Sequence, residues 1–414
     1  MTAVQRVATT AAAVGITTVE IGYSKACGTM HPYHRGMRTL QTEGASDSRG
    51  NGEDLTLREL TACLATKEMT ADQLAAAASQ ATQTAADSIV EQLLHDKQRM
   101  LEEHYGLREG FEQRIVEVWG PALDFYQAVY TCCLEAGEEY CNRVVRHARG
   151  ENDLRFEALL LQHARACMVA SEIHGLLRTG HAVGAQARWR TLHEIVVAST
   201  LLGEGDQVLA RRFFDHRAIE RYKDAEDYQE HCSALGYEPL SAEEFEPIRE
   251  AYQRAIDDHE KGFSKEWGWA RPSLAGADPH FAALARQAGF AHMRPWYMLA
   301  TRGTHSGVTG ALHVRDLHGR GTVMLAGPSN AGLADPGHAA LLSLYQVTMT
   351  FILHGSTIPT NADDIALVLA IRRLVDAAGH EFLSAHHDLE AREATTADDP
   401  GQGDDAAPSP DDCA

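Results

Sequence analysis

The sequence predicts an all-α protein: an irregular multi-helix bundle with a helical N-terminal arm and disordered termini. First, apolar residues recur every three or four positions through most of residues 57–391, which is the spacing of one helix face. Second, helix-start signals recur, because Thr56, Thr70 and Ser241 each stand three residues before Glu or Gln, as in a capping box. Third, polar or acidic stretches without this spacing bound the helical part at both ends.

Composition limits the functions to be considered. The 414 residues exceed the usual size of one domain and can bury a large core without disulfides. The net charge is −21, of which residues 390–414 contribute −7 through eight acids and one base, so the body of the chain is acidic as well. An acidic balance disfavours wrapping long nucleic acid by broad electrostatic attraction.

The cysteines and the apolar runs predict a cytoplasmic protein. The eight cysteines form no C-x-x-C pair, and several lie among apolar residues in helical patterns, as reduced and buried thiols do. No run approaches 18 uncharged apolar residues, so no membrane span is expected. The threonine-rich segment 7–19 makes a poor signal peptide.

The N-terminal part divides into two predicted regions. Residues 1–54 are expected to form a disordered arm and linker, because 41–54 are small, polar and glycine-rich. Residues 55–150 are expected to be helical. The helices predicted there cover 57–66, 71–104, 107–118 and 121–147, with Pro121 in a first turn. A helical arm of this kind usually serves in packing or dimerisation, so a homodimer is one expected assembly.

A core helical domain is predicted for residues 151–391, centred on the stretch 185–223. Within this stretch Arg190 and Glu194 lie four positions apart and therefore side by side on one helix, next to an apolar stripe. This arrangement indicates an ion pair that acts as an internal strut.

Gly203 and Gly205 are expected to end that helix. The next helix, which reaches about residue 223, should then fold back antiparallel against it, and the pair should form the centre of the core. Other helices are expected at 154–177 and 241–261, from residues 278 and 295, and at 338–354 and 363–391.

Loops are predicted within the core domain, and a tail is predicted after it. Trp267 and Trp269 stand in a loop that should lie over the core. The glycine-rich segment 318–337 is expected to be a loop with a short strand pair at 322–325. Residues 392–414 are predicted to be a disordered acidic tail.

Motifs for metals, nucleophiles and phosphate cradles are missing from the sequence. The 22 histidines include no E-x-x-H and no H-E-x-x-H spacing, and there is no G-x-S-x-G. No cofactor and no metal site are therefore predicted. Ligands scattered along the sequence could still converge on a metal inside a helical bundle, which keeps a metal-dependent enzyme as one alternative.

Arg302 and His305 are the candidate catalytic residues. If the helix from residue 295 continues through them, their spacing places guanidinium and imidazole on one face. A cation and a group that titrates near neutral pH could together cleave an RNA phosphodiester without metal. The structural alternative is a core hydrogen bond for His305 and an acidic partner for Arg302. Gly303 and Gly307 weaken the helix there.

Residues 172–307 resemble a bacterial family labelled domain of unknown function 5677. The resemblance is carried by Arg190 to Glu194, Glu220-Arg221-Tyr222-Lys223, Trp267-Gly268, and Tyr297 through Thr301 to His305. Thr301 stands where serine is more usual. The resemblance implies an all-helical fold without an established activity. The late Arg and His are also similar to those of HEPN ribonucleases, whose motif has four to six residues between them, whereas two separate Arg302 and His305.

Three functions are open at this point. The first is a HEPN-like, metal-independent ribonuclease of bacterial stress or phage defence, with RNA as partner, His305 as acid/base and Arg302 on the phosphate. The pocket would be shaped by Arg190, Glu194, Trp267 and Tyr297. The second is a non-enzymatic module that binds a small ligand or acts as a sensor, with Trp189, Trp267, Trp269, Trp296 and Tyr297 lining a groove or a dimer face. The third is the metal-dependent helical-bundle enzyme.

Overall fold

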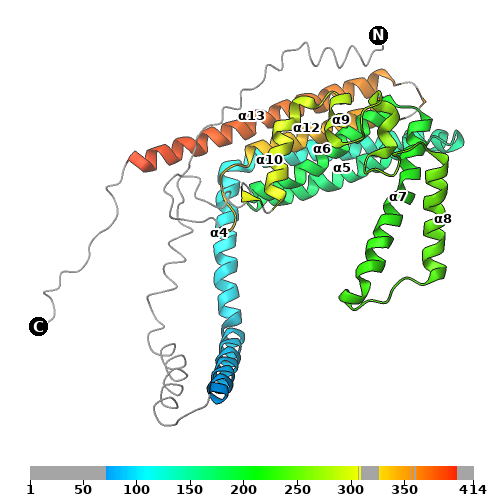
Figure 1. Ribbon diagram of the computed structural model, residues 1–414. Helices are drawn as coiled ribbons and strands as arrows, with labels where there is room; N and C mark the ends of the chain where they lie inside the picture. The colour runs from blue at the N-terminus through cyan, green and yellow to red at the C-terminus, as the bar shows by residue number, and fades with distance from the viewer. Residues whose placement is uncertain (1–70, 306, 309–325, 356, 359, 399–414) are drawn as a thin grey trace, which may run out of the picture.

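The computed structural model describes residues 71–305, 307–308, 326–355, 357–358 and 360–398 (Figure 1). Every regular element in these ranges is a helix, which confirms the predicted all-α class. Several predictions lie outside the described residues: the disordered arm 1–54, the helix 57–66 with the capping boxes at Thr56 and Thr70, the strand pair 322–325, and the predicted tail from residue 399 on. Residues 392–398 were predicted to begin the disordered tail, but they continue the last helix instead.

Seven long helices and several short ones make up the described part. The long helices are α4 (Ala71–Gly150), α5 (Leu154–Arg178), α6 (Ala182–Glu204), α7 (Gln207–His231), α8 (Ala242–Asp258), α12 (Ala334–His354) and α13 (Ala362–Asp398). The short ones are α9 (Phe281–Gln287), α10 (Arg294–Thr304) and the 3₁₀ segments η1 (Cys232–Leu235), η2 (Gly268–Leu274) and η3 (Ala291–Met293). None of these helices is long and apolar enough to cross a membrane.

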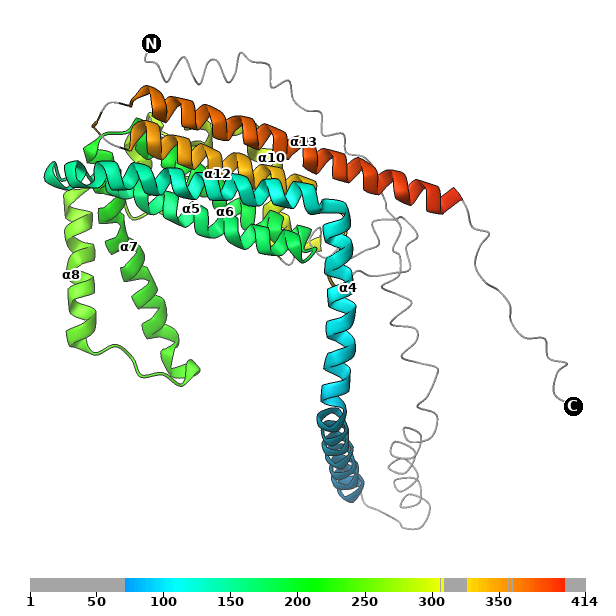
Figure 2. The same ribbon diagram turned by 180° about the vertical axis from the view of Figure 1, so that it is seen from behind.

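Helix α12 lies at the centre of the bundle. It packs against α5, α6, α13 and the C-terminal part of α4, which run side by side with it (Figures 1 and 2). No charged side chain stands between its His338 and His354, so it can be buried on nearly every side. Trp189 of α6 fixes this packing, because its indole Nε1 donates a hydrogen bond to Ser343 Oγ of α12 at 3.0 Å.

The expected central hairpin of two helices does not form. Helix α6 does pack in the core, against α5, α10 and α12, but α7 packs with α8, and the two project from the bundle (Figure 1). The reason is that α7 buries few side chains and carries charge on most of its surface. Gly203 lies inside α6 and does not end it: a Cβ there would approach Thr350 Cγ2 of α12 to 2.7 Å. Gly205 caps the helix, as predicted.

Helix α4 joins three segments that were predicted to be separate helices. Gly106 and Gly110 do not interrupt it, and Pro121 lies in its interior. A proline there removes one helical hydrogen bond and bends the helix. Figure 2 shows that α4 turns sharply between a part inside the bundle and a part that extends away from it. The inner part buries Trp119 and Tyr126, and we call residues 82–110 of the outer part the arm.

Candidate functional site

The predicted strut between Arg190 and Glu194 is formed on α6. A guanidinium nitrogen of Arg190 lies 3.0 Å from Glu194 Oε1, and the two side chains are 30 % and 25 % exposed. Tyr297 of α10 joins the pair: its hydroxyl donates to Glu194 Oε1 at 2.6 Å, and Arg190 lies over its ring, 5.0 Å from the centroid. Burial, together with the hydrogen bond to Glu194, raises the pKa of Tyr297 to about 12. The three side chains therefore fasten α10 onto α6.

An aromatic layer extends this contact toward the loop before η2. Phe281 stacks on Tyr297 with 4.4 Å between ring centroids, and Trp267 lies against Phe281 at 5.8 Å. His193 lies beneath this layer, where burial, with a smaller effect of His292, lowers its pKa to about 4. His193 is therefore a neutral core residue at physiological pH.

Only part of the predicted aromatic set reaches the surface. Trp267, Trp296 and Tyr297 are partly buried and pack around the core, while Trp189 and Trp269 are buried. The buried pair serves the core, so it cannot line an open groove.

The Trp267-Gly268 loop is held by the charged segment of α7. Lys223 Nζ donates to the carbonyl of Ser264 at 2.6 Å. Gly268 is required where it stands, because a Cβ there would lie 2.0 Å from the carbonyl oxygen of Phe263. The segments that carry the family resemblance, far apart in sequence, are thus neighbours along one side of α6 and α7.

Arg302 and His305 lie at the exposed end of α10. Arg302 is in the last helical turn, whereas His305 is the residue after the helix, with extended backbone (φ −100°, ψ 147°). Its amide still donates to the carbonyl of Thr301 at 3.2 Å, so the helical hydrogen-bond pattern reaches His305 before the chain leaves the helix. Arg302 and His305 are both exposed there.

A buried arginine network nearby was not predicted. Arg212 of α7 forms two hydrogen bonds to Glu260, at 2.7 and 2.8 Å, and donates to the carbonyls of Gly268 and Trp269. It also donates to His259 Nδ1 at 3.2 Å, and since arginine cannot accept, His259 carries its proton on Nε2, which points to Asp215 at 3.1 Å. This network stabilises the loop after α8.

The network contains pairs and not a metal-ligand cluster. Within the described ranges, no three His, Cys, Asp or Glu side chains gather as the ligands of a metal ion would.

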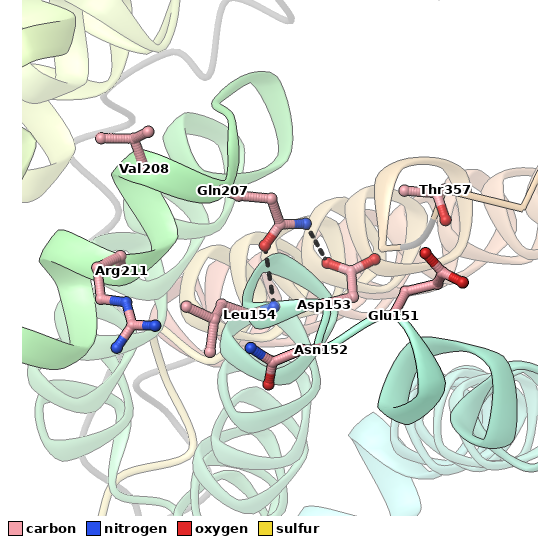
Figure 3. A pocket seen from close by; sticks show the side chains of 8 residues that line it. All are labelled: Glu151, Asn152, Asp153, Leu154, Gln207, Val208, Arg211 and Thr357. Carbon is pink, nitrogen blue, oxygen red and sulfur yellow. Dashed lines mark hydrogen bonds between the residues drawn. The ribbon is translucent and has the colours of Figure 1, made fainter.

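A polar pocket of about 510 Å³ lies where α4, α5 and α7 meet (Figure 3). Asp153 caps α5 there: its Oδ1 accepts from the amide of Phe156 at 3.1 Å and from Gln207 Nε2 at 2.6 Å. Gln207 Oε1 in turn accepts from the amide of Leu154 at 2.9 Å. The buried Oδ2 of Asp153 has no hydrogen-bond partner. Asp153 and Gln207 thus bind each other and the first amides of α5, and so close the corner between the helices.

The arm of α4 carries an exposed apolar face. Its large apolar side chains are 40–66 % exposed: Ile89, Val90, Leu93, Leu94, Met100, Tyr105 and Leu107. At 100° per residue they occupy one side of the helix, and the same side continues into Phe111 and Ile115, which are buried in the bundle. The arm therefore extends a core-forming surface beyond the core.

Comparison with known proteins gives one match. Neither a search of curated proteins nor one of solved structures finds a protein similar to this chain. A family model described as a family of unknown function, DUF5677, matches residues 156–321. The match covers the strut, the charged segment of α7, the tryptophan loop and α10, which confirms the resemblance seen in the sequence, while the arm and the helices from α12 on lie outside it. Residues 156–321 of this protein are therefore similar to the family of unknown function DUF5677.

Proposed function

We propose that this protein is a non-enzymatic helical binding module that associates with a partner through the arm of α4. The observation that carries this proposal is the apolar face of the arm, whose seven large side chains stay 40–66 % exposed although the same face is buried farther along α4. An exposed apolar stripe on a helix is the usual means of helix–helix recognition.

The α6–α10 contact supports a binding module more than an enzyme. Arg190, Glu194 and Tyr297 pair with one another and hold α10 on α6, although the buried Nε of Arg190 has no hydrogen-bond partner. Catalysis requires reacting groups that are held in a fixed mutual geometry. Arg302 and His305 are exposed at the end of α10, outside the α6–α10 contact.

We place the module in the cytoplasm. Five of the described cysteines are free thiols, and Cys133, Cys167 and Cys232 are buried. Buried free thiols are typical of proteins in reducing compartments.

The proposal is tested by photo-crosslinking in cells. A photo-reactive amino acid is placed at Leu93, in the middle of the apolar face, or at His95, which is exposed on the opposite side of the same helix turn. The Leu93 position should give discrete crosslinked products on illumination, and the His95 position should give none or far fewer. Equal labelling from both positions, or none from either, would contradict the proposal.

The ribonuclease hypothesis stays a prediction with its own decisive assay. The purified full chain is incubated with single-stranded RNA beside its His305→Ala and Arg302→Ala variants. We expect no cleavage above background from any of them. Cleavage by the wild type that disappears in a normally folded His305→Ala protein would establish the enzyme and remove the non-enzymatic module.

A further inference from the structure

We propose that the partner of the arm is a second copy of this chain, bound antiparallel along the apolar face; this inference rests on the proposed function. The residues of the face alternate in steps of three and four, as the core positions of a coiled coil do. These positions are Val90, Leu93, Lys97, Met100, His104 and Leu107. Leu94 and Leu101 widen the stripe on one side.

The pattern is self-complementary only when the two arms run in opposite directions. In the register centred between Gln98 and Arg99, Val90 faces Leu107 of the second copy, and Lys97 faces Met100. The aliphatic stem of a lysine can cover such a methionine while its ammonium reaches water. A parallel pair in register would instead place the Lys97 ammonium of one copy against that of the other, and these like charges repel. A two-fold axis across the middle of the arm satisfies the isologous contact that a homodimer needs.

The size of the face suits a dimer. From Ile89 to Leu107 the stripe is about 27 Å long at 1.5 Å per residue. If each of the seven exposed side chains loses roughly 80 Å² in each chain, the pair buries about 1,100 Å² of apolar surface before flanking polar groups are counted. That area approaches the lower end of stable interfaces, about 1,200 Å² in total.

Sedimentation velocity of the purified full chain tests the dimer. The wild type should sediment with about twice the 45.2 kDa chain mass at micromolar concentration. Leu93→Lys should weaken association by about tenfold or more, because it places a second charge in the stripe. His95→Lys, the matched control, adds the same charge on the opposite side and should leave the dimer unchanged. Leu93 lies outside the bundle, so at concentrations where the wild type is monomeric both variants should have its melting temperature.

Engineered disulfides test the direction. The double variant Val90→Cys with Leu107→Cys should form a covalent dimer on mild oxidation. Val90→Cys alone should not exceed the wild-type background, because the two copies of residue 90 lie about 25 Å apart along antiparallel arms. Crosslinking by Val90→Cys alone would mean parallel arms and would overturn the proposal, as would a dimer that Leu93→Lys does not weaken.

The outcomes separate this inference from the proposed function. The purified chain could be monomeric while the photo-reactive Leu93 position still crosslinks to another protein or to another segment of the same chain. In that case the inference of a second copy is wrong, and the proposal that the arm binds a partner surface remains. If neither experiment detects contact at Leu93, both proposals fall.

Discussion

A single buried guanidinium, that of Arg212, organises the loop beside the tryptophans. Its five donors match a bidentate carboxylate, two backbone carbonyls and one imidazole nitrogen, which suits the fixed fork of arginine and no other side chain. Its side chain is 7 % exposed and that of Glu260 is 44 % exposed. Water therefore screens the ion pair from the Glu260 side only. The two backbone carbonyls depend on Arg212 as their hydrogen-bond donor.

Arg212→Ala should lower the free energy of unfolding by roughly 3 kcal/mol, because buried carbonyls and a charged partner lose their donors together. Arg212→Lys should be intermediate, since one ammonium cannot reach all of these acceptors. Urea denaturation measures both. Arg211→Ala is the control. The side chain of Arg211, next to Arg212 in the sequence, is exposed, so its removal should change the free energy of unfolding by no more than about 0.5 kcal/mol. Equal effects at positions 211 and 212 would show that the network carries no stability.

At the scale of elements, helix α4 shows how context overrides local signals. Glycine in a helix costs about 1 kcal/mol relative to alanine, and an interior proline costs about 3 kcal/mol. Gly106, Gly110 and Pro121 therefore predict breaks, yet the helix is continuous in the structure. The buried face that includes Ile115, Trp119 and Tyr126 more than offsets these costs, and only the bend remains as a trace of the proline.

The start of α5 depends on one cap. Asp153→Ala removes the acceptor for the Phe156 amide and for Gln207, so we expect a loss of about 1–2 kcal/mol in the free energy of unfolding. Asp153→Asn keeps an oxygen in the capping position and should cost less than half as much. Thermal and urea unfolding of the two variants give the comparison, and a harmless Asp153→Ala would mean that Gln207 alone satisfies the helix start.

At the scale of the whole molecule, the bundle buries histidines in their neutral form. Burial lowers the pKa of His163 to about 4, with a hydrogen bond to the Cys133 backbone acting in the opposite direction, and His193 has a similar value. The unfolded chain, with a histidine pKa near 6.5, takes up these protons first. The contribution of these neutral histidines to the free energy of unfolding is therefore complete above pH 6.5 and should be lost as the pH falls toward 4.

Each such histidine should weaken folding by about 1.4 kcal/mol for every pH unit between these two values. Urea denaturation at pH 7, 6 and 5 measures the slope. His193→Gln, although less stable at pH 7, should show a shallower dependence on pH than the wild type. His95→Gln, which changes an exposed histidine of the arm, should keep the full slope. Parallel curves for His193→Gln and the wild type would show that His193 is not buried in neutral form.

The sequence by itself determined what depends on neighbours along the chain. Helical spacing is a local property, so it predicted the all-α class and most helices, and the i, i+4 rule predicted the pair of Arg190 and Glu194. The capping box at Ser241 is formed for the same reason.

Only the tertiary structure decided what depends on residues far apart. Tyr297 meets Glu194 across 103 positions, and Arg212 meets Glu260 across 48, and no periodicity encodes such contacts. The same holds for the central place of α12, the projection of α7 with α8, and the uncovered arm. Each of these features depends on which apolar faces pack against each other in three dimensions. Packing between elements decides which residues are buried, and the pattern within a single element does not.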